Sequence, residues 1–216
     1  MSLDTKAILE AVKQIRERSE KKNFNQSVEL IINLQDIDMK KPEAKIQETI
    51  ELPHTSSKKG KICVIATGEL ALKAKKAGAD LIIDNSELEE LATDKKRRKK
   101  LANDYGVFIA EAPLMPLIGK TLGSTLGPRD KMPKPVPPSA DIKTQIERSK
   151  KTITLRLRGQ PVLQCTVGTE DLKDEQIVEN VGTVIRRLEG KLKRGLKNIT
   201  SIYLKTTMGK PVKVKL

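Results

Sequence analysis

The sequence predicts a two-domain protein of mixed α/β and α+β class, in which one domain interrupts the other. Residues 61–110 alternate short, wholly apolar runs with helical runs, which is typical of a doubly wound α/β domain. The segments on either side carry strands with alternating apolar and polar residues, as in sheets with one open face. We therefore predict a discontinuous, split β-α-β domain from residues 1–57 and 151–216, with a Rossmann-like α/β domain inserted at 58–150. The alternative is three consecutive small units, but the first 57 residues alone are too few for a comfortable core.

The first segment is expected to hold one helix and two strands. Apolar residues recur at helical spacing over residues 7–15 and predict a helix, whose N-terminus Asp4 can cap. Residues 24–34 then alternate, with Phe24 on the same parity as the apolar residues that follow, and predict a strand. A polar loop at 40–42 leads to a second short strand near residues 49–52.

The inserted segment predicts three buried strands at residues 61–66, 80–83 and 107–110. Helices are expected through residues 69–77 and from Ser86 onward, which completes the βαβ pattern of a parallel sheet. The segment ends at residues 126–138, which are too rich in proline for a helix or a central strand.

The last segment returns to alternating strands. Residues 151–158 alternate strictly, a turn follows at 159–161, and residues 162–167 are expected to form the hairpin partner. A long helix opens with two acidic residues at 174–175, and Gly195 is its expected stop. The tail beyond residue 200 is predicted to pair as a final strand or hairpin.

The charge of the chain favours a polyanionic partner. Among 216 residues there are 42 Lys and Arg against 28 Asp and Glu, a net charge of +14. From Arg186 onward there are ten Lys and Arg but a single acid, Glu189, so the charge is concentrated near the C-terminus. A basic enzyme that is merely soluble is the plainer alternative. The few aromatic residues argue against binding single strands by base stacking, and favour a folded RNA contacted through sugars and phosphates. They are Phe24, Tyr105, Phe108 and Tyr203.

No constellation for catalysis, a cofactor or a metal is evident. A phosphate-binding loop at residues 118–121 would need a glycine where Leu114 stands, and His54 is the only histidine. Cys63 and Cys165 match no metal-ligand spacing, and both are expected to be buried thiols. We therefore predict no enzyme, no cofactor and no metal. With no membrane-length apolar run and no signal-peptide core, the protein is expected to be soluble and cytoplasmic.

The strongest run of charge is Lys95-Lys-Arg-Arg-Lys-Lys100. A nuclear signal or a direct nucleic-acid contact would explain it. The solvated end of a surface helix is the favoured interpretation, because such a run needs no partner.

A polar sheet face is the candidate binding surface. Ser27 and Glu29 share one face of the early strand, and Ser201, Tyr203, Lys205 and Thr207 share one face of the tail. Beside this face, Gly209 would let a sugar or phosphate approach the backbone, and Met208 could lie against a base or ribose. The alternative is an ordinary outer sheet face, with Met208 filling a gap in the core. Because a carboxylate repels phosphate, Glu29 is expected to accept from a base amino group or to orient a neighbouring Lys or Arg.

Three stretches together resemble the signatures of the large-subunit ribosomal protein L-one family, the protein of the mobile side stalk beside the exit-tRNA site. They are Phe24-Asn-Gln-Ser-Val-Glu-Leu30, Gly127-Pro-Arg-Asp-Lys-Met-Pro-Lys-Pro135 and Thr206-Thr-Met-Gly-Lys-Pro211. They occur in the family's order over nearly the whole chain, and residues 33–39 resemble archaeal members. The chain departs from the family at Asn23, where a lysine is common, and at Asp130, where glycine is common.

The resemblance implies a function and a set of RNA contacts in the split domain. The protein would be a structural constituent of the large subunit that binds stalk ribosomal RNA, assists release of deacylated exit-site tRNA and represses translation of its own mRNA. It would be a monomer off the ribosome. The RNA contacts that the resemblance implies are Phe24, Ser27, Glu29, Ser201, Thr207, Met208 and Gly209. The candidate RNA-binding set also includes the neighbouring Lys205, Thr206 and Lys210, with secondary contacts at Lys22, Arg129 and Lys131. The rival functions are an α/β enzyme acting on a phosphorylated substrate and a general DNA-binding protein.

Overall fold

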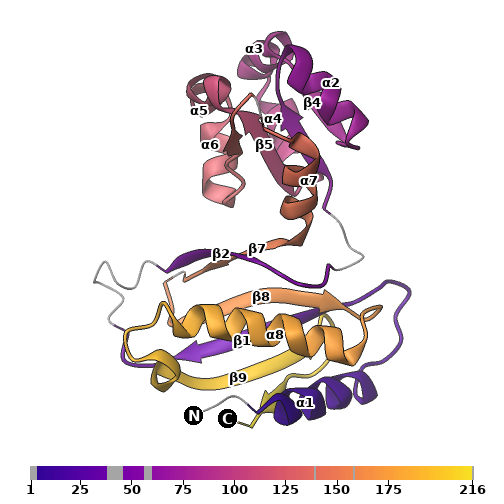
Figure 1. Cartoon of the computed structure of the whole chain (residues 1–216), viewed down its shortest axis with the longest axis vertical. Helices are drawn as coiled ribbons and strands as arrows, with labels where there is room; N and C mark the ends of the chain where they lie inside the picture. Colours follow the sequence, from indigo (N-terminus) through magenta and orange to yellow (C-terminus); the bar gives the residue numbers. More distant parts are fainter. Residues whose placement is uncertain (1–3, 38–45, 56–59, 139, 158, 216) are drawn as a thin grey trace. The chain divides into compact units, whose positions relative to one another are not determined.

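The computed structural model describes residues 4–37, 46–55, 60–138, 140–157 and 159–215 (Figure 1). The chain forms two compact units, Met1–Lys58 with Lys151–Leu216, and Lys59–Lys150. We call them the split unit and the inserted unit. The predicted mixed fold class with an interrupted domain is confirmed. The polar loop predicted at 40–42 and the predicted boundary at 57–58 lie outside the described residues.

The split unit is built on an antiparallel sheet of four strands in the order β10-β9-β1-β8. The strands are β1 (Ser27–Leu34), β8 (Val162–Thr169), β9 (Ile199–Thr206) and β10 (Val212–Val214). The central pair joins the two ends of the chain, with Val28 opposite Thr206 and Glu29 opposite Lys205. The tail forms the predicted hairpin, β9 with β10.

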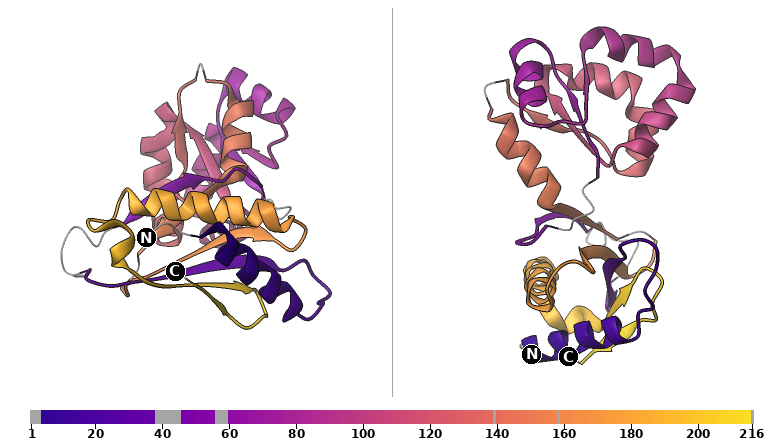
Figure 2. Two further views of the ribbon diagram at one scale, coloured as in Figure 1. Left: turned by 60° about the horizontal axis from the view of Figure 1, so that its bottom comes forward. Right: turned by 90° about the vertical axis from the view of Figure 1, so that its right-hand side faces the viewer.

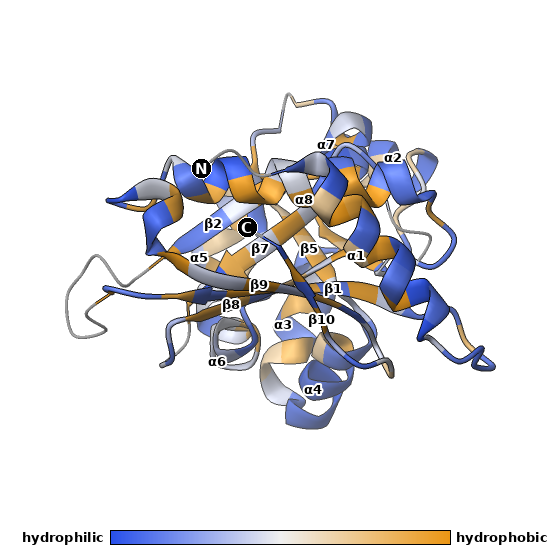
Figure 3. Ribbon diagram, turned by 90° about the horizontal axis from the view of Figure 1, so that it is seen from below, coloured by the Kyte–Doolittle hydropathy of each residue, from blue (hydrophilic) through white to orange (hydrophobic). Residues whose placement is uncertain are grey.

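Two helices cover one face of this sheet, α1 (Thr5–Glu17) and α8 (Asp174–Glu189) (Figure 2). Their apolar stripes and the inward residues of β1, β8 and β9 form one continuous core. Figure 3 shows the apolar side of each helix turned toward the sheet and the hydrophilic side turned away. On β1 every second residue is buried and the others are half-buried, so the sheet keeps its second face more open.

A two-stranded ribbon completes the split unit and corrects one prediction. β7 (Thr152–Arg156) pairs with β2 (Gln47–Glu51), and β8 pairs with β1, so the predicted hairpin between residues 151–158 and 162–167 is wrong. Alternation specifies which side chains of a strand face the core, but it does not specify the neighbouring strand. Ile50 and Leu155 of the ribbon join the same core.

Two element ends also differ from the predictions. β1 begins at Ser27, so Phe24 precedes the strand and is 46% exposed. The long helix ends at Glu189 with Gly190 as its C-cap. Gly195 has a φ of 55° and opens the 3-10 turn η4 (Gly195–Asn198) instead of ending α8.

The inserted unit is a doubly wound parallel sheet in the order β4-β3-β5-β6. Its strands are β3 (Ile62–Ile65), β4 (Leu81–Ile83), β5 (Val107–Glu111) and β6 (Lys134–Val136). One face packs against α2 (Gly68–Lys76) and α7 (Ile142–Lys151). The other packs against α3 (Asn85–Thr93), α4 (Lys95–Asp104), α5 (Met115–Thr121) and α6 (Gly123–Leu126). Both faces are therefore covered, as expected for wholly apolar strands.

The proline-rich stretch is more regular than predicted. It contains the 3-10 turn η3 (Gly127–Arg129) and the short strand β6, and α7 follows it where no helix was predicted. β6 lies at the edge of the sheet, where the missing N–H of Pro135 leaves the ladder intact. The basic run opens its own helix, α4, with Asp94 as N-cap, and does not end the helix that begins near Ser86. No helix in the described ranges is both long and apolar enough to cross a membrane.

Candidate nucleic-acid interface

The loop that follows β9 is joined to the start of β1 by the side chain of Thr207. The Thr207 N–H donates to the Ser27 carbonyl at 3.0 Å, and its hydroxyl accepts from the Ser27 N–H at 3.0 Å. The same hydroxyl lies 3.3 Å from the Ser27 carbonyl, to which it donates. Thr207 thus extends the ladder beyond the last residue of β9. One lone pair of its oxygen is left for a ligand.

Thr206 is a correction to the predicted set. It is 1% exposed and lies on the inward side of β9, where its Oγ1 is 3.2 Å from the Ser19 hydroxyl. Its parity in the strand is that of Leu204, which is buried in the core. Thr206 supports the loop from below and presents no side chain to a ligand.

Gly209 is required by the loop itself. A Cβ at this position would stand 2.2 Å from Oγ1 of Thr206, so any side chain would displace the loop. The sequence suggested that the glycine admits a ligand to the backbone. In the structure its missing Cβ faces the protein, and the glycine lets the loop close over Thr206.

On the open face of the sheet, the predicted polar residues Glu29, Ser201 and Lys205 each have a polar neighbour. Lys205 Nζ lies 3.6 Å from a Glu29 carboxylate oxygen and donates to the Thr207 carbonyl at 3.1 Å. Glu29 therefore orients a neighbouring cation, one of the two roles expected for it. Further along, Asn33 donates to the Ser201 hydroxyl at 2.9 Å, and Ser201 is 7% exposed. Ser201 keeps its hydroxyl proton for a ligand, although little of its surface is accessible.

Met208 and Phe24 are the exposed apolar side chains of this region. Met208 is 66% exposed and Phe24 is 46% exposed, so neither fills a gap in the core. The alternative interpretation of Met208 as a core residue is therefore wrong. An exposed, polarizable side chain beside cations is suited to contact with a ribose or base.

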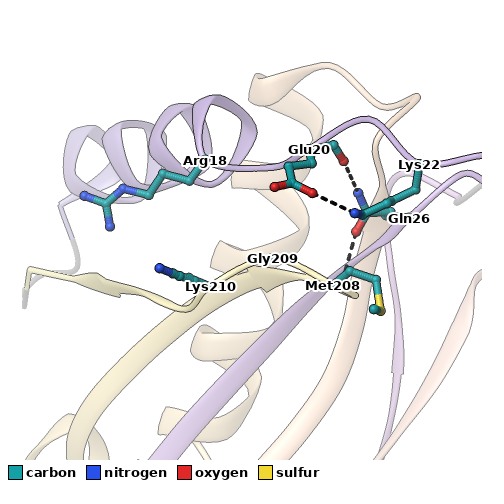
Figure 4. Close-up of a pocket in the computed structure, with 7 residues that line it drawn as sticks. All are labelled: Arg18, Glu20, Lys22, Gln26, Met208, Gly209 and Lys210. Atoms are coloured by element: carbon teal, nitrogen blue, oxygen red, sulfur yellow. Dashed lines mark hydrogen bonds and ion pairs between the residues drawn. The ribbon is translucent and has the colours of Figure 1, made fainter.

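A hollow of about 490 Å³ lies beside Met208 (Figure 4). It is lined by Arg18, Glu20, Lys22, Gln26, Met208, Gly209 and Lys210. Lys22 lies 2.7 Å from Glu20, and this hydrogen bond, with the charge of Lys22, lowers the pKa of the Glu20 carboxyl. Three cations against one carboxylate leave the hollow positively charged, which suits phosphate.

Several residues of this region were missed by the sequence analysis. Arg18 lies just past α1. The buried Gln26 and the half-buried Ser19 and Glu170 form a hydrogen-bonded cluster beneath the loop. A glutamine at an inward position of a strand-like run was a signal for Gln26. Nothing local could connect it with Glu170, because the two lie far apart in the sequence.

Of the three predicted secondary contacts, Lys22 lines the hollow, whereas Arg129 and Lys131 lie in the inserted unit and are hydrogen-bonded within it. Arg129 donates to Asn103 at 2.5 Å, and Lys131 Nζ donates to the carbonyls of Ala102 and Tyr105 at 2.7 and 2.8 Å. Burial, and then the charge of Arg129, lowers the pKa of Lys131. These cations fasten their loop to the end of α4, so the expectation that they contact RNA loses its support. Asp130 between them has a φ of 56°, a left-handed conformation that favours glycine and that aspartate tolerates better than most residues.

The site that a phosphorylated substrate would use in a doubly wound fold is occupied by a carboxylate. Such ligands bind at the carboxyl ends of the strands, near a helix N-terminus. Here the N–H and hydroxyl of Thr67, which follows β3 and caps α2, both donate at 3.0 Å to the Glu111 carboxylate at the end of β5. The negative charge of Glu111 repels phosphate, which disfavours the rival enzyme hypothesis.

The described residues offer little other reactive chemistry. In those ranges no group of three or more His, Cys, Asp and Glu could hold a metal. His54 lies 2.6 Å from Glu179 on the surface of the split unit. Burial raises the pKa of the thiols of Cys63 and Cys165 to about 12, so both are protonated and unreactive at neutral pH.

Comparison with known proteins agrees with this geometry. The pattern of the Ribosomal protein L1p/L10e family matches residues 15–210. The chain is 47% identical to a protein of Methanothermobacter thermautotrophicus, over 96% of this chain and 98% of the relative. It is 48% identical to a protein of Pyrococcus abyssi, over 100% of this chain and 98% of the relative. It is 47% identical to a protein of Methanocaldococcus jannaschii, over 99% of this chain and 97% of the relative. Each relative is named large ribosomal subunit protein uL1. The chain belongs to the Ribosomal protein L1p/L10e family, and the resemblance noted in the sequence is confirmed.

Proposed function

We propose that this protein is a non-enzymatic structural constituent of the large ribosomal subunit that binds ribosomal RNA of the side stalk through its split unit. Family membership supports this role, since the relatives are named as proteins of that subunit. The observation that carries the RNA-binding assignment is the exposed Met208, set between a positively charged hollow and a polar sheet face. A folded RNA offers the matching chemistry of phosphates, ribose hydroxyls and base edges.

Different residues of the split unit would contact different chemical groups of the RNA. The cations at the hollow would contact phosphates, and their contribution would fall as salt rises. The hydroxyls of Ser27 and Ser201 and the Glu29 carboxylate would bind 2′-hydroxyls or base amino groups, which distinguishes RNA from DNA. Phe24 and Met208 would pack against sugars and bases without reading one sequence.

Met208→Asp tests the assignment. We expect this change to weaken binding of an in vitro transcript of the stalk ribosomal RNA by at least about a hundredfold, because a carboxylate would face phosphates at the centre of the surface. The circular dichroism spectrum should stay unchanged, since the side chain is 66% exposed. Filter binding or fluorescence anisotropy measures the affinity.

Leu72→Asp is the matched control. Leu72 is 64% exposed on α2 of the inserted unit, so the variant introduces the same charge at the same exposure. Its affinity should remain that of the unchanged protein. Equal losses in the two variants, or none in Met208→Asp, would refute the split unit as the binding surface. Equal affinity for stalk RNA and duplex DNA at fixed salt would instead favour a general nucleic-acid binder.

A second part of the proposal is that the protein assists release of deacylated tRNA from the exit site. Support comes from the family resemblance to the side-stalk protein, because a protein at that position would lie beside the departing tRNA. Ribosomes depleted of this protein and then reconstituted with it would be compared for the rate of deacylated-tRNA release. We expect slower release in the depleted particles, and an equal rate would remove this part of the proposal.

The third part is repression of the protein's own translation. A surface that recognises a folded RNA by shape would accept a messenger segment of similar fold. A reporter carrying the leader and early codons of its own mRNA should be repressed by the protein, and excess stalk RNA should relieve the repression. Met208→Asp should fail to repress. A reporter unaffected by the unchanged protein would refute this part alone.

A further inference from the structure

We infer that Gln26 is a positioning residue, which holds the backbone of Met208 so that the Met208 side chain points outward. Glu170 in turn sets the orientation of the Gln26 side-chain amide. This inference rests on the proposed RNA-binding function and deepens it. Gln26 is 0% exposed, so it acts through Met208 and the loop instead of touching a ligand with a free side chain.

The contacts of Gln26 join the start of β1 to three other segments, and Figure 4 shows those with Glu20 and Met208. Its side-chain Nε2 lies 2.9 Å from the Ser19 hydroxyl, 3.1 Å from the Glu20 carbonyl and 3.0 Å from one Glu170 carboxylate oxygen. Its side-chain Oε1 accepts the N–H of Met208 at 3.0 Å. The turn after α1, the start of β1, the residue after β8 and the loop after β9 are thereby joined at one buried amide.

Glu170 determines which end of the amide faces Met208. Its second carboxylate oxygen accepts the backbone N–H of Gln26 at 3.1 Å, and its own N–H donates to the Gln26 carbonyl at 3.0 Å. An ionised carboxylate only accepts hydrogen bonds, so the NH₂ end of Gln26 must turn toward it. The oxygen end is then directed at the N–H of Met208.

The result is a loop held along its whole length. Thr207 is hydrogen-bonded to Ser27, and the N–H of Met208 is hydrogen-bonded to the Gln26 side chain. The N–H of Gly209 donates to the Thr206 carbonyl at 3.1 Å. With its backbone held on the inside, Met208 projects its side chain outward. A loop ordered before binding loses less conformational entropy when the ligand binds, which raises affinity.

A purely structural role does not explain the choice of glutamine. Gln26 precedes Ser27 on the same parity as Val28 and Leu30, which are buried and apolar. An apolar side chain would fill this position, whereas a buried amide must have its hydrogen bonds satisfied. What an apolar residue could not do is accept the N–H of Met208.

Gln26→Met is the first test, since it keeps the length of the side chain and removes the amide. We expect affinity for the stalk RNA transcript to fall by about tenfold, the usual value of one hydrogen bond in such a setting. The salt dependence of binding should not change, because no cation is lost. In the free protein the amide of Met208 should exchange its hydrogen faster, while amides in the middle of β1 keep their protection.

Asn198→Leu is the matched control. Asn198 is a second buried amide, 3% exposed, that accepts from Arg194 and donates to the Gln35 carbonyl at the other end of β9. This variant should lose thermal stability comparably and keep its RNA affinity. If it loses as much affinity as Gln26→Met, the effect of Gln26 is general destabilisation and the inference is wrong.

An exchange of the two side chains tests the orientation. Gln26→Glu alone places two carboxylates together and should weaken binding by at least about tenfold. Combining it with Glu170→Gln removes the repulsion between the two carboxylates and keeps an acceptor for the Met208 N–H, so affinity should rise at least about threefold above that of Gln26→Glu. It should stay below that of the unchanged protein, because the Glu20 carbonyl loses its donor. A double variant no better than Gln26→Glu would overturn the role of Glu170.

The outcomes separate this inference from the proposed function. If the unchanged protein binds stalk RNA, Met208→Asp does not and Gln26→Met does, the function stands and the positioning role fails. If the unchanged protein does not bind stalk RNA, the proposed function fails, and faster exchange at the Met208 amide alone would still support the positioning role.

Discussion

The two units of this protein use their sheets in opposite ways. The split unit covers one face of an antiparallel sheet with α1 and α8 and keeps the other face more open and polar. The inserted unit covers both faces of a parallel sheet and closes the carboxyl ends of its strands with Glu111. The difference teaches that a polar group can serve a ligand only where the fold has not already paired it, as it has paired Thr67 with Glu111 in the inserted unit.

The two units also differ in how they carry positive charge. In the inserted unit, six consecutive Lys and Arg residues open α4, and Arg98 from this run donates to the Thr121 carbonyl at 2.8 Å. In the split unit, Arg18 and Lys22 near the N-terminus and Lys210 near the C-terminus converge on one hollow. Density of charge along the sequence is therefore a weaker sign of a site than convergence in space.

The largest expected change in stability comes from comparing Gly209 in the loop after β9 with Gly182 in α8. Gly209→Ala would place a Cβ against Thr206 Oγ1, so we expect a loss of about 1–3 kcal/mol in unfolding free energy and weaker RNA binding. Gly182→Ala, within α8, would meet only the end of Arg186 at 3.9 Å and should gain about 0.5–1 kcal/mol. Urea denaturation measures both, and a stabilised Gly209→Ala would contradict the account of the loop.

The next effect compares the two basic clusters. Replacing Arg18, Lys22 and Lys210 together with Gln should weaken stalk RNA binding and lower its salt slope by up to about one unit per residue. Replacing Lys95, Lys96, Lys99 and Lys100 with Gln should change affinity only slightly. Anisotropy titrations at several salt concentrations measure the slopes. A larger loss from the second set would move the main site to the inserted unit.

A smaller effect tests the closed end of the inserted sheet. Glu111→Ala removes the acceptor of the Thr67 N–H and hydroxyl and should cost about 1 kcal/mol of unfolding free energy. RNA affinity should not change. In thermal melts of the unchanged protein, millimolar ATP should produce no shift, because a true ligand at saturation raises stability by about 2–3 kcal/mol. A clear shift would revive the enzyme hypothesis.

The smallest effect concerns pH and the buried thiol of the inserted unit. The pKa of Cys63 is raised by burial, and then by the charge of Glu87, from 9.0 to about 12. Below pH 9 the thiol is protonated in both the folded and the unfolded chain, so the free energy of unfolding does not depend on it. Between pH 9 and 12 the thiol ionises only in the unfolded chain. The free energy of unfolding therefore falls as the pH rises through this range. From pH 8 to 10 the unchanged protein should lose about 1 kcal/mol more than Cys63→Ala does. Equal losses in the two proteins would contradict this burial effect.

Local patterns were enough to predict most of the elements. The alternation of residues 28–34 placed Val28 and Leu30 inward, and the wholly apolar run at 62–65 predicted a strand covered on both faces. These patterns work because burial of a side chain depends on its own hydrophobicity and on the period of its element. The pairing of β7 failed, because a strand does not encode its neighbour.

The candidate site was predicted in outline and corrected in detail. Met208 is exposed and lies beside the start of β1, yet Thr206 points inward and Gly209 faces the protein. Lys131 looked like a free cation in the sequence, but it is bonded to two carbonyls of its own unit. A side chain of a given type can serve a ligand or the fold, and only its neighbours decide which.

The sequence by itself determined the interrupted two-unit plan, the buried face of each main strand, the concentration of charge near the C-terminus and the family. Only the tertiary structure decided that Gln26 and Glu170 meet beneath Met208, and that Glu111 closes the end of β3 against Thr67. The physical reason for this division is the separation along the sequence over which each interaction acts. Hydrophobic periodicity acts within a few residues, whereas hydrogen bonds between residues 44 to 182 positions apart exist only after the chain has folded.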